Sequence, residues 1–491
     1  MTRLTEAALC ALPASVQKPA YDRTAHAVGI VHLGVGAFHK AHQAVYTDDA
    51  LAAAGGDWRI AGIGLRRPDA EEALAPQDGL YTLIERGPEG PRARVIGALA
   101  EVLTAPRDPA RTRALLTAPS TRIVSLTVTE KAYGLDPATG GLDAARPDIA
   151  ADLASPDAPT TAVGWIVHAL GLRRTAGLAP FTPLSCDNLP ENGAVLGRLV
   201  REFAARVDPD LAAWIAAEVP FPSTMVDRIT PASTDETLAD ARRLAGFEDE
   251  AATETEPFTQ WVIEDRFAAG RPAWDAAGAI LAADVRPYEA MKLRLLNGAH
   301  SLIAYSGAVA GLAHVRDVMG REDLAALVAA HQDAVARTLA PVPGIDLDAY
   351  QRDLRARFAN PAMAHRTVQI AMDGSQKLPP RLVEPALEAL ERGLPWRTCA
   401  FAIAAWMRFL EGRDEAGAEL PLSDPLAETL RATLAAAGSD PGDRARALLA
   451  LEAIFPPTLS RHDAFARTVA EDLARIVRDG MLPAARAALE G

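Results

Sequence analysis

The chain has 491 residues, a length typical of two or three domains. With 49% hydrophobic and 23% charged residues it has an ordinary globular composition, and its three cysteines exclude a disulfide scaffold or a zinc site made of cysteines alone. The net charge of -14 argues against nucleic acid or an anionic membrane as the main partner, but it allows a local basic pocket for small anions.

The N-terminal segment, residues 1–20, contains no sustained apolar run of the kind found in signal peptides. Together with the few thiols, this predicts a cytoplasmic protein. Residues 295–315 carry no formal charge and are long enough to span a membrane. Because Asn297, His300 and His314 would be costly in lipid, we expect this stretch to be a buried core helix instead.

Short β-branched apolar runs alternate with helical stretches in the first half of the chain. The expected strands are residues 29–34, 58–65, 122–129 and 181–185, and the expected helices are residues 41–54, 68–75 and 162–176. Such alternation is typical of an α/β domain with a parallel sheet and helices on both faces. We place this domain at residues 1–284.

The second half is dominated by alanine, leucine, arginine and glutamate, for example in residues 321–339, 385–393 and 463–489. Helix formers with apolar residues three and four positions apart predict a mostly α-helical domain, which we place at residues 285–491. The segments rich in proline and glycine at residues 86–92 and 339–344 are expected to be loops.

A possible phosphate loop follows the first expected strand, where Gly34 and Gly36 precede a helix. In a Rossmann fold the first glycine allows a tight turn and the second lets the backbone approach the pyrophosphate. The third glycine of the motif is replaced by His39, so an ordinary strand-to-helix turn stays an alternative. After the second strand, Arg66 suits the 2′-phosphate of NADP, whereas Asp69 suits the ribose hydroxyls of NAD.

The segment 286–301, RPYEAMKLRLLNGAHS, is the most informative. As a single α-helix with about 100° per residue it would place Glu289, Lys292, Asn297 and His300 within an arc of roughly 140°. A lysine in an apolar pocket can act as a general base, an asparagine amide can hold the reacting oxygen, and a histidine can orient either group. A hydrogen-bonded polar network at a domain interface stays the structural alternative.

Other chemistries find no support in the sequence. No zinc-binding pattern and no G-x-S-x-G motif is present, so we expect proton transfer without a metal. The spacing of Tyr288 and Lys292 matches the Tyr-x-x-x-Lys pair of short-chain dehydrogenases. Those chains are about half as long and place the pair nearer their glycine loop, so we do not adopt that interpretation.

Several long segments together resemble the mannitol dehydrogenase family, the polyol-specific long-chain dehydrogenases and reductases. In chain order they are GIVHLGVGAFHKAHQAVYTDD, VTEKAYG, LSCDNLPENG, FPSTMVDRITP, WVIED, RPYEAMKLRLLNGAHS and DGSQKLPP. The resemblance implies an NAD(P)-binding Rossmann domain, a helical substrate domain and an active site in the cleft between them. It also implies catalysis without a metal.

The resemblance assigns the proton-transfer groups. Lys292 is expected to be the general base, Asn297 and Asn188 to stabilise the oxyanion, His300 to position lysine and substrate, and Glu289 to gate proton exchange with solvent.

The outer site residues follow in the same way. Asp227 and Lys377 are expected to contact the substrate, and the cofactor is expected to be lined by Gly34, Gly36, Phe38, Arg66 (adenosine ribose) and Thr129 (nicotinamide). Local alternatives stay open: Asn188 could cap a turn, Asp227 could pair with Arg228, and Lys377 could be a solvated loop residue.

The implied reaction is a reversible hydride transfer between a secondary alcohol and NAD, with NADP left open by Arg66. The segments FPSTM and LPENG, with basic residues at Lys377 and Arg381, favour D-mannonate and D-fructuronate as the substrate pair. D-Mannitol and D-fructose, another polyol such as D-arabinitol, and a non-catalytic dinucleotide-binding protein are the alternatives. The only partner we expect is a small polyol, uronate or aldonate, without nucleic acid or membrane, and the sequence is compatible with a monomer.

Overall fold

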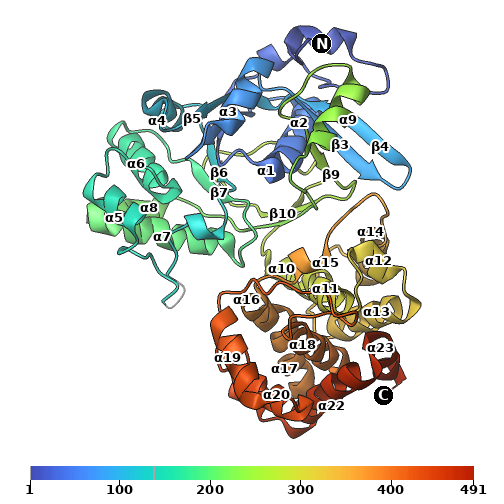
Figure 1. Ribbon diagram of the computed structural model, residues 1–491. Coiled ribbons are helices and arrows are strands. Elements are labelled where there is room, and N and C mark those ends of the chain that lie inside the picture. Colours follow the sequence, from blue (N-terminus) through green and yellow to red (C-terminus); the bar gives the residue numbers. More distant parts are fainter. Residues whose placement is uncertain (1, 137–138, 491) are drawn as a thin grey trace. The chain divides into compact units, whose positions relative to one another are not determined.

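A computed structural model describes residues 2–136 and 139–490 of the chain (Figure 1). The chain divides into two compact units, Met1–Arg286 and Pro287–Gly491. The boundary expected from the sequence, between residues 284 and 285, lies two residues before this division.

The first unit is built around a parallel sheet with the strand order β5-β2-β1-β6-β7. Its strands are β1 (Val28–Leu33), β2 (Arg59–Gly64), β5 (Leu99–Thr104), β6 (Ile123–Leu126) and β7 (Thr182–Ser185). Numbered along the chain within this sheet, the order is 3-2-1-4-5, the order of a Rossmann fold. The predicted α/β class is confirmed, and the four predicted strands are present with ends that differ by at most three residues.

Both faces of this sheet are buried, because successive residues of a strand point to opposite sides. In β1, Ile30 packs into one core with Val45 of the helix that follows, whereas Val31 and Leu33 pack into the other with helices that come later in the chain. The α-helices of this unit are α1 (Ala37–Ala41), α2 (Gln43–Ala54), α3 (Asp69–Leu74), α4 (Pro109–Thr117), α5 (Pro147–Ala154), α6 (Ala162–Thr175), α7 (Asn192–Val207), α8 (Pro209–Glu218) and α9 (Asp235–Ala245). Short 3₁₀ turns are η1 (Glu6–Ala11), η2 (Arg23–Ala25), η3 (Ala75–Gln77) and η4 (Glu130–Ala132).

Two smaller sheets complete the unit, in the orders β4-β3-β9 and β11-β10-β8. Their strands are β3 (Tyr81–Gly87), β4 (Gly90–Ile96), β8 (Thr224–Asp227), β9 (Thr253–Thr255), β10 (Gln260–Glu264) and β11 (Ile280–Ala282). The loop expected at residues 86–92 is wrong: β3 and β4 form an antiparallel hairpin in which Gly87 pairs with Gly90. Glycine and proline mark only its tight turn, while Ala93 and Val95 are buried on one face of the strand.

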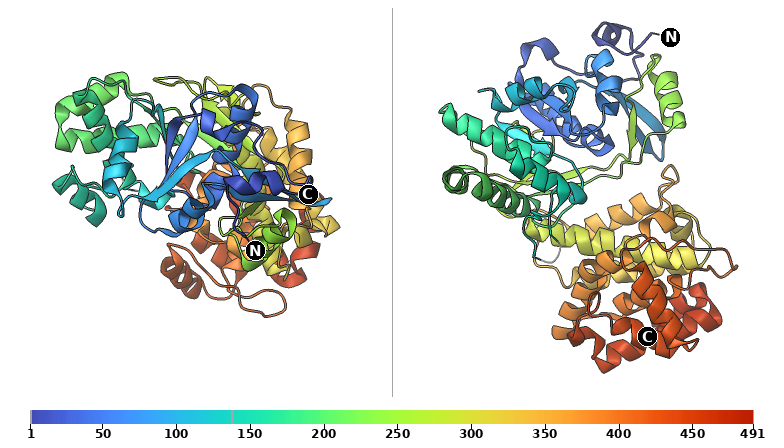
Figure 2. Two further views of the ribbon diagram at one scale, coloured as in Figure 1. Left: turned by 90° about the horizontal axis from the view of Figure 1, so that it is seen from above. Right: turned by 60° about the vertical axis from the view of Figure 1, so that its left-hand side comes forward.

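The second unit is helix-rich, as expected. Its core contains α11 (Ala299–Val309), whose residues are all buried and which packs against α13, α15 and α18 (yellow and orange in Figure 2). Its α-helices are α10 (Arg286–Met291), α11, α12 (Val315–Met319), α13 (Glu322–Ala336), α14 (Leu347–Phe358), α15 (Thr367–Ile370), α16 (Gly374–Leu378), α17 (Glu384–Glu391), α18 (Arg397–Phe409), α19 (Ala427–Ala437), α20 (Pro441–Leu449), α21 (Pro457–Ser460), α22 (Asp463–Asp479) and α23 (Met481–Glu490).

Two sequence expectations concern this unit. The uncharged stretch at 295–315 indeed contributes a buried core helix, and no helix among the described residues is long and apolar enough to cross a bilayer. The helical segment expected at 463–489 is two helices, because Gly480 adopts a φ of +87° and ends α22.

Candidate functional site

The glycine loop lies between β1 and α1. Gly34 has a φ of +95°, and a Cβ at this position would lie 2.2 Å from the carbonyl oxygen of Thr127. A glycine is therefore required here both for the backbone conformation and for the close approach of β6. A Cβ at Gly36 would meet nothing within 4 Å, so its side faces open space.

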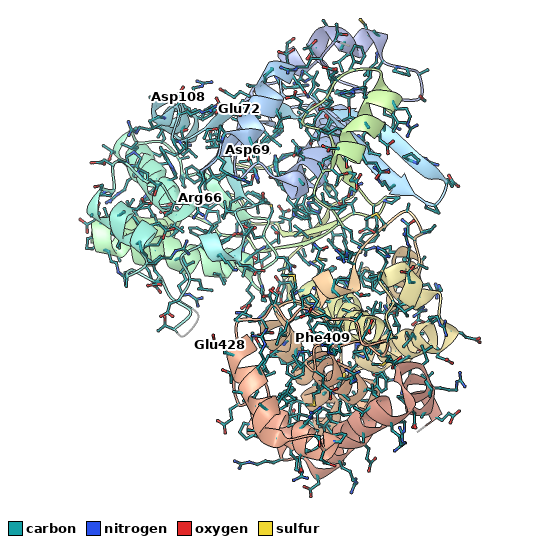
Figure 3. The ribbon with its side chains drawn as sticks, in the orientation of Figure 1. Arg66, Asp69, Glu72, Asp108, Phe409 and Glu428 are labelled. Atoms are coloured by element: carbon teal, nitrogen blue, oxygen red, sulfur yellow. The ribbon has the colours of Figure 1, made fainter. Side chains whose placement is uncertain are left out.

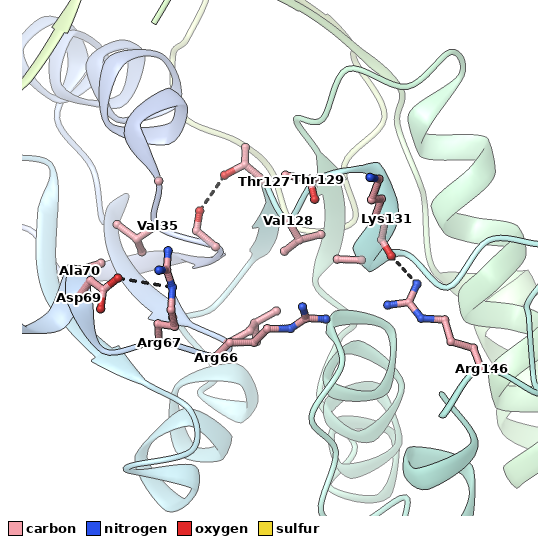
Figure 4. Close-up of a pocket in the computed structure, with 15 residues that line it drawn as sticks. Val35, Arg66, Arg67, Asp69, Ala70, Thr127, Val128, Thr129, Lys131 and Arg146 are labelled. Atoms are coloured by element: carbon pink, nitrogen blue, oxygen red, sulfur yellow. Dashed lines mark hydrogen bonds and ion pairs between the residues drawn. The ribbon is translucent and has the colours of Figure 1, made fainter. Parts of the chain in front are cut away.

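A pocket of about 350 Å³ lies beyond the carboxyl ends of β1, β2 and β6 (Figure 4). This is where the strand order of the sheet reverses, the usual ligand position in open α/β sheets. Its lining residues are Gly34, Val35, Gly36, Gly64, Leu65, Arg66, Arg67, Asp69, Ala70, Thr127, Val128, Thr129, Lys131, Ala132 and Arg146. Of the residues predicted to line a cofactor, Gly34, Gly36, Arg66 and Thr129 belong to this set, whereas Phe38 stacks on His42 with 4.9 Å between ring centroids.

Basic side chains dominate the charge of this pocket. Arg66, labelled with Asp69 in Figure 3, is 72% exposed and lies 3.6 Å from Asp148. Arg67 lies 3.4 Å from Asp69 (Figure 4). Exposed pairs of this kind are weak, so both guanidinium groups can turn to a bound anion. Lys131 and Arg146 add positive charge that sequence reasoning did not identify: Lys131 lies in the VTEKAYG segment but was given no role there, and Arg146 lies outside the quoted segments.

His39, which replaces the third motif glycine, has a structural role. Its buried ring stacks on His32 with 3.5 Å between centroids. The His32 ring nitrogens lie 2.9 Å from Ser125 Oγ and 2.9 Å from Thr127 Oγ1, and burial lowers the pKa of His32 to about 3. These neutral rings pack next to the glycine loop and support it.

Two predicted site residues, the oxyanion residue Asn188 and the substrate residue Asp227, lie in the first unit. Asn188 is exposed and follows β7, and Asp227 is the buried last residue of β8. The neighbouring Arg228 forms an ion pair of 2.6 Å with Glu85 and also donates to backbone carbonyls.

The segment 286–301 is helical but not a single α-helix, which corrects our expectation. Between α10 and α11 it forms a π-helical segment, η5 (Lys292–Gly298). A π-helix bonds residue i to residue i+5, so Lys292 and Asn297 are separated by one turn of this wider helix rather than by the angle that 100° per residue predicts. Segments of this kind are frequent at functional sites.

Neighbouring elements support the π-helical segment. Gln332 of α13 donates to the carbonyl of Leu295 over 3.2 Å, and Arg294 bonds Thr338 and pairs with Glu388 at 2.7 Å. The segment packs against a second π-helical turn, η6 (Pro379–Val383). Tyr288 donates its hydroxyl to the carbonyl of Pro343 over 2.7 Å. This hydroxyl, which a Tyr-x-x-x-Lys mechanism would need, is therefore already hydrogen-bonded.

Gly298 sets the approach between the two π-helical turns. A Cβ at this position would lie 3.0 Å from the carbonyl oxygen of Arg381 and 3.2 Å from His331 Nε2. We expect Gly298→Ala to lower kcat about 10-fold, because it moves the backbone next to Asn297 by a few tenths of an ångström. Gly320→Ala, at the end of α12, is the control for the loss of a glycine, because its φ is −74° and a Cβ there would meet no atom closer than 3.4 Å. Equal kcat values in the two variants would contradict the prediction.

His300 of α11 is buried beside Phe358 and His365, with ring centroids 4.6 and 5.5 Å away. Burial holds the pKa of His300 well below its usual range, and the charges of His365, Arg381, Arg357 and Lys292 lower it further. The imidazole is therefore neutral and can both accept and donate a hydrogen bond.

Three buried polar atoms at this site point to a ligand. Asn297 Oδ1, His300 Nε2 and His365 Nδ1 have no hydrogen-bond partner within the described part of the chain. Buried polar groups are nearly always bonded, so each is accounted for if a polar molecule binds here. His365 comes from a loop with no periodic pattern, and sequence reasoning missed it.

The remaining predicted residues of the second unit come from α10, α16 and η6. Glu289 lies in α10 three residues before Lys292. Lys377 of α16 donates to the carbonyl of Ile370 over 3.2 Å and lies 4.0 Å from Asp373. Arg381 donates to Ser301 Oγ over 3.3 Å, next to His300 in sequence. Among the described residues no group of three or more histidine, cysteine or acidic side chains is arranged to hold a metal ion.

Comparisons with known proteins agree with both units. Family models described as the mannitol dehydrogenase Rossmann domain and the mannitol dehydrogenase C-terminal domain match residues 28–276 and 284–477. An uncharacterized oxidoreductase of Escherichia coli K12, YeiQ, is 45% identical over 474 residues, covering 96% of each chain. The D-mannonate oxidoreductase of the same strain is 45% identical over 465 residues, covering 92% of this chain and 94% of its own. Pseudomonas fluorescens mannitol 2-dehydrogenase, solved with NAD and D-mannitol, has a TM-score of 0.86 and 38% identity over the full length of both chains.

Proposed function

The chain belongs to the mannitol dehydrogenase family of oxidoreductases, and from this premise we propose that it interconverts D-mannonate and D-fructuronate with NAD. The family establishes an enzyme that acts on a CH–OH group. The choice of a sugar acid rather than a polyol depends on the charge around His300.

That charge is the observation that carries the proposal. Lys292, Arg357 and Arg381 all act electrostatically on His300, and Lys377 acts on His365. A neutral polyol needs hydrogen-bond partners but no surplus of positive charge, whereas a carboxylate is bound well by a charge-assisted pair. The nearby Asp373 offsets part of this charge at Lys377, so Arg381 is the stronger candidate for the carboxylate contact. The 45% identity to a D-mannonate oxidoreductase supports the same substrate.

The first unit suits a dinucleotide. The pocket beyond β1, β2 and β6 is lined by Gly34, a position where only glycine fits against the end of β6. Its described lining residues also include four basic side chains. When bound there, NAD supplies the hydride acceptor and, in reduced form, the hydride donor. Arg66 and Asp69 would lie near the adenosine ribose, and Thr129 near the nicotinamide.

Proton transfer is assigned to the second unit. In the direction of oxidation Lys292 takes the proton of the substrate hydroxyl, which lets the carbonyl form as the hydride leaves. Asn297 stabilises the negative charge that develops on that oxygen. The neutral His300 orients Lys292 or the substrate through a hydrogen bond, and Glu289 passes the proton toward solvent.

The experiment is the rate of NADH oxidation at saturating cofactor, with D-fructuronate and D-fructose in parallel. We expect a higher kcat/KM for D-fructuronate. A higher value for D-fructose would replace the proposal with mannitol 2-dehydrogenase activity, which the likeness to the enzyme solved with D-mannitol already makes the second candidate. NADH binding without turnover of any sugar would indicate a non-catalytic protein.

The preference for NAD is expected to depend on Asp69. Its carboxylate is 65% exposed at the start of α3 and would repel the 2′-phosphate of NADP. We expect Asp69→Ala to raise kcat/KM with NADPH about 10-fold, because the repulsion of the 2′-phosphate is lost, while Arg66, which pairs with Asp148 and not with Asp69, keeps its charge for that phosphate. In the double variant Asp69→Ala/Arg66→Ala the gain in kcat/KM with NADPH should disappear. An unchanged kcat/KM with NADPH in Asp69→Ala would contradict the assignment of Asp69 to the adenosine ribose.

A further inference from the structure

The backbone of Thr129 adopts a conformation that side chains avoid. Its φ is +68° and its ψ is +153°, a region that is essentially restricted to glycine. Thr129 is also β-branched, which makes the conformation less favourable still. Contacts elsewhere must therefore offset the strain.

The carboxylate of Asp187 provides those contacts. Its Oδ1 accepts the backbone N–H of Thr129 over 3.0 Å, and its Oδ2 accepts the N–H of Val128 over 3.1 Å and the hydroxyl of Tyr133 over 2.7 Å. Asp187 is only 9% exposed, and Tyr133 is held in turn by Ser185 over 2.6 Å. Both carboxylate oxygens of Asp187 are therefore hydrogen-bonded, one to Thr129 and the other to Val128 and Tyr133.

This segment is one wall of the cofactor pocket. Thr127, Val128 and Thr129 all line it, and Thr127 is attached to the glycine loop by a hydrogen bond of 2.8 Å to the carbonyl of Gly34 (Figure 4). Thr129 also precedes the short turn η4, which carries Lys131 to the same pocket. A change in the Thr129 backbone would therefore move the wall and one of its basic side chains together.

We propose that Asp187 is a positioning residue for the cofactor: it holds Thr129 in its strained backbone conformation and so keeps the Val128–Lys131 wall in place. This inference rests on the proposed use of the pocket by NAD. It goes beyond the predicted role of Asn188, because Asp187 acts through the peptide backbone of residues 128 and 129 and not on the substrate.

The test is the Kd of NADH, measured by fluorescence titration without any sugar. In Asp187→Asn the amide cannot accept from all three donors, and we expect the Kd to rise about 10-fold or more. Measured against Thr129→Gly alone, Asp187→Asn/Thr129→Gly should raise the Kd far less than Asp187→Asn does in the wild-type background, because glycine adopts the required φ without help. A role of Asp187 in overall stability alone would raise the Kd by the same factor in both backgrounds.

Asp152 offers a matched control. It is 1% exposed and accepts the backbone N–H groups of Thr160 and Thr161 over 2.9 and 2.8 Å, but it does not line the pocket. Asp152→Asn should lower the melting temperature and leave the Kd of NADH unchanged. A Kd that is unchanged in Asp187→Asn, or raised by the same factor in the wild-type and Thr129→Gly backgrounds, would overturn the inference.

Two further measurements keep the test decisive. If Asp187→Asn does not fold, Tyr133→Phe removes one of the three hydrogen bonds and should raise the Kd by a smaller factor, which should be smaller still in the Thr129→Gly background. An unchanged Kd in Tyr133→Phe would then overturn the inference. Because no sugar is present, a wrong substrate assignment leaves these results unaffected. A wild-type protein that binds no NADH would refute the proposed function itself.

Discussion

Lys292→Ala is expected to lower kcat for D-fructuronate reduction by about 10³-fold to 10⁴-fold, the upper range for loss of a general acid–base group. Lys292 begins the π-helical segment and acts electrostatically on the neutral His300. Lys377 acts on the neighbouring His365 and is held by the carbonyl of Ile370 and by Asp373, so we do not expect it to replace the proton-transfer group. The measurement is steady-state NADH oxidation at saturating substrate.

The same variant should bind NADH normally, because the pocket beyond β1, β2 and β6 is lined entirely by residues of the first unit. Added methylamine should restore part of the activity, since it supplies the missing amine. Arg294→Lys is the control within the same helical turn: it disturbs the bonds to Thr338 and Glu388 and should lower stability more than kcat. A Lys292→Ala enzyme that keeps more than about one tenth of its kcat would refute the assignment of the base.

Arg381→Met is expected to lower kcat/KM for D-fructuronate about 100-fold, as for loss of a charge-assisted hydrogen bond to a carboxylate. Arg381 lies in η6, against the π-helical segment, and contacts Ser301 beside His300. Methionine keeps much of the length and apolar volume of the side chain, so the main change is the lost charge. For D-fructose the decrease should be several-fold smaller.

Arg486→Met serves as the control for the loss of an arginine in the same unit. Arg486 pairs with Asp323 at 2.9 Å on the surface, and its loss should leave both substrates unaffected. Equal decreases for D-fructuronate and D-fructose in Arg381→Met would mean that Arg381 supports the fold of the site rather than the carboxylate.

The sequence predicted the parallel sheet because both of its faces are buried. Strands such as β1 and β6 then read as short continuous apolar runs that stand out between helices. The hairpin of β3 and β4 was mistaken for a loop, because its turn carries proline and glycine and the residues next to that turn are not buried. Local composition could not show that the flanking residues pair.

The candidate site also contains some residues that the sequence could reveal and others that it could not. Residues that belong to a contiguous motif, such as Gly34 and Lys292, could be identified from their spacing. Arg357 and His365 come from a helix and a loop that reach His300 only through the tertiary fold. The π-helical pitch of η5 also depends on partners far along the chain, Gln332 and the carbonyl of Arg381 near Gly298.

The recognition of a carboxylate can be measured without turnover. D-Mannonate titrated into the protein–NADH complex cannot react, because both molecules are already reduced, and NADH fluorescence reports binding. We expect D-mannonate to bind about 10-fold or more tightly than D-mannitol, and its Kd to rise with salt concentration, as for an ion pair. Equal or tighter binding of D-mannitol, with no dependence on salt, would contradict a site built for sugar acids.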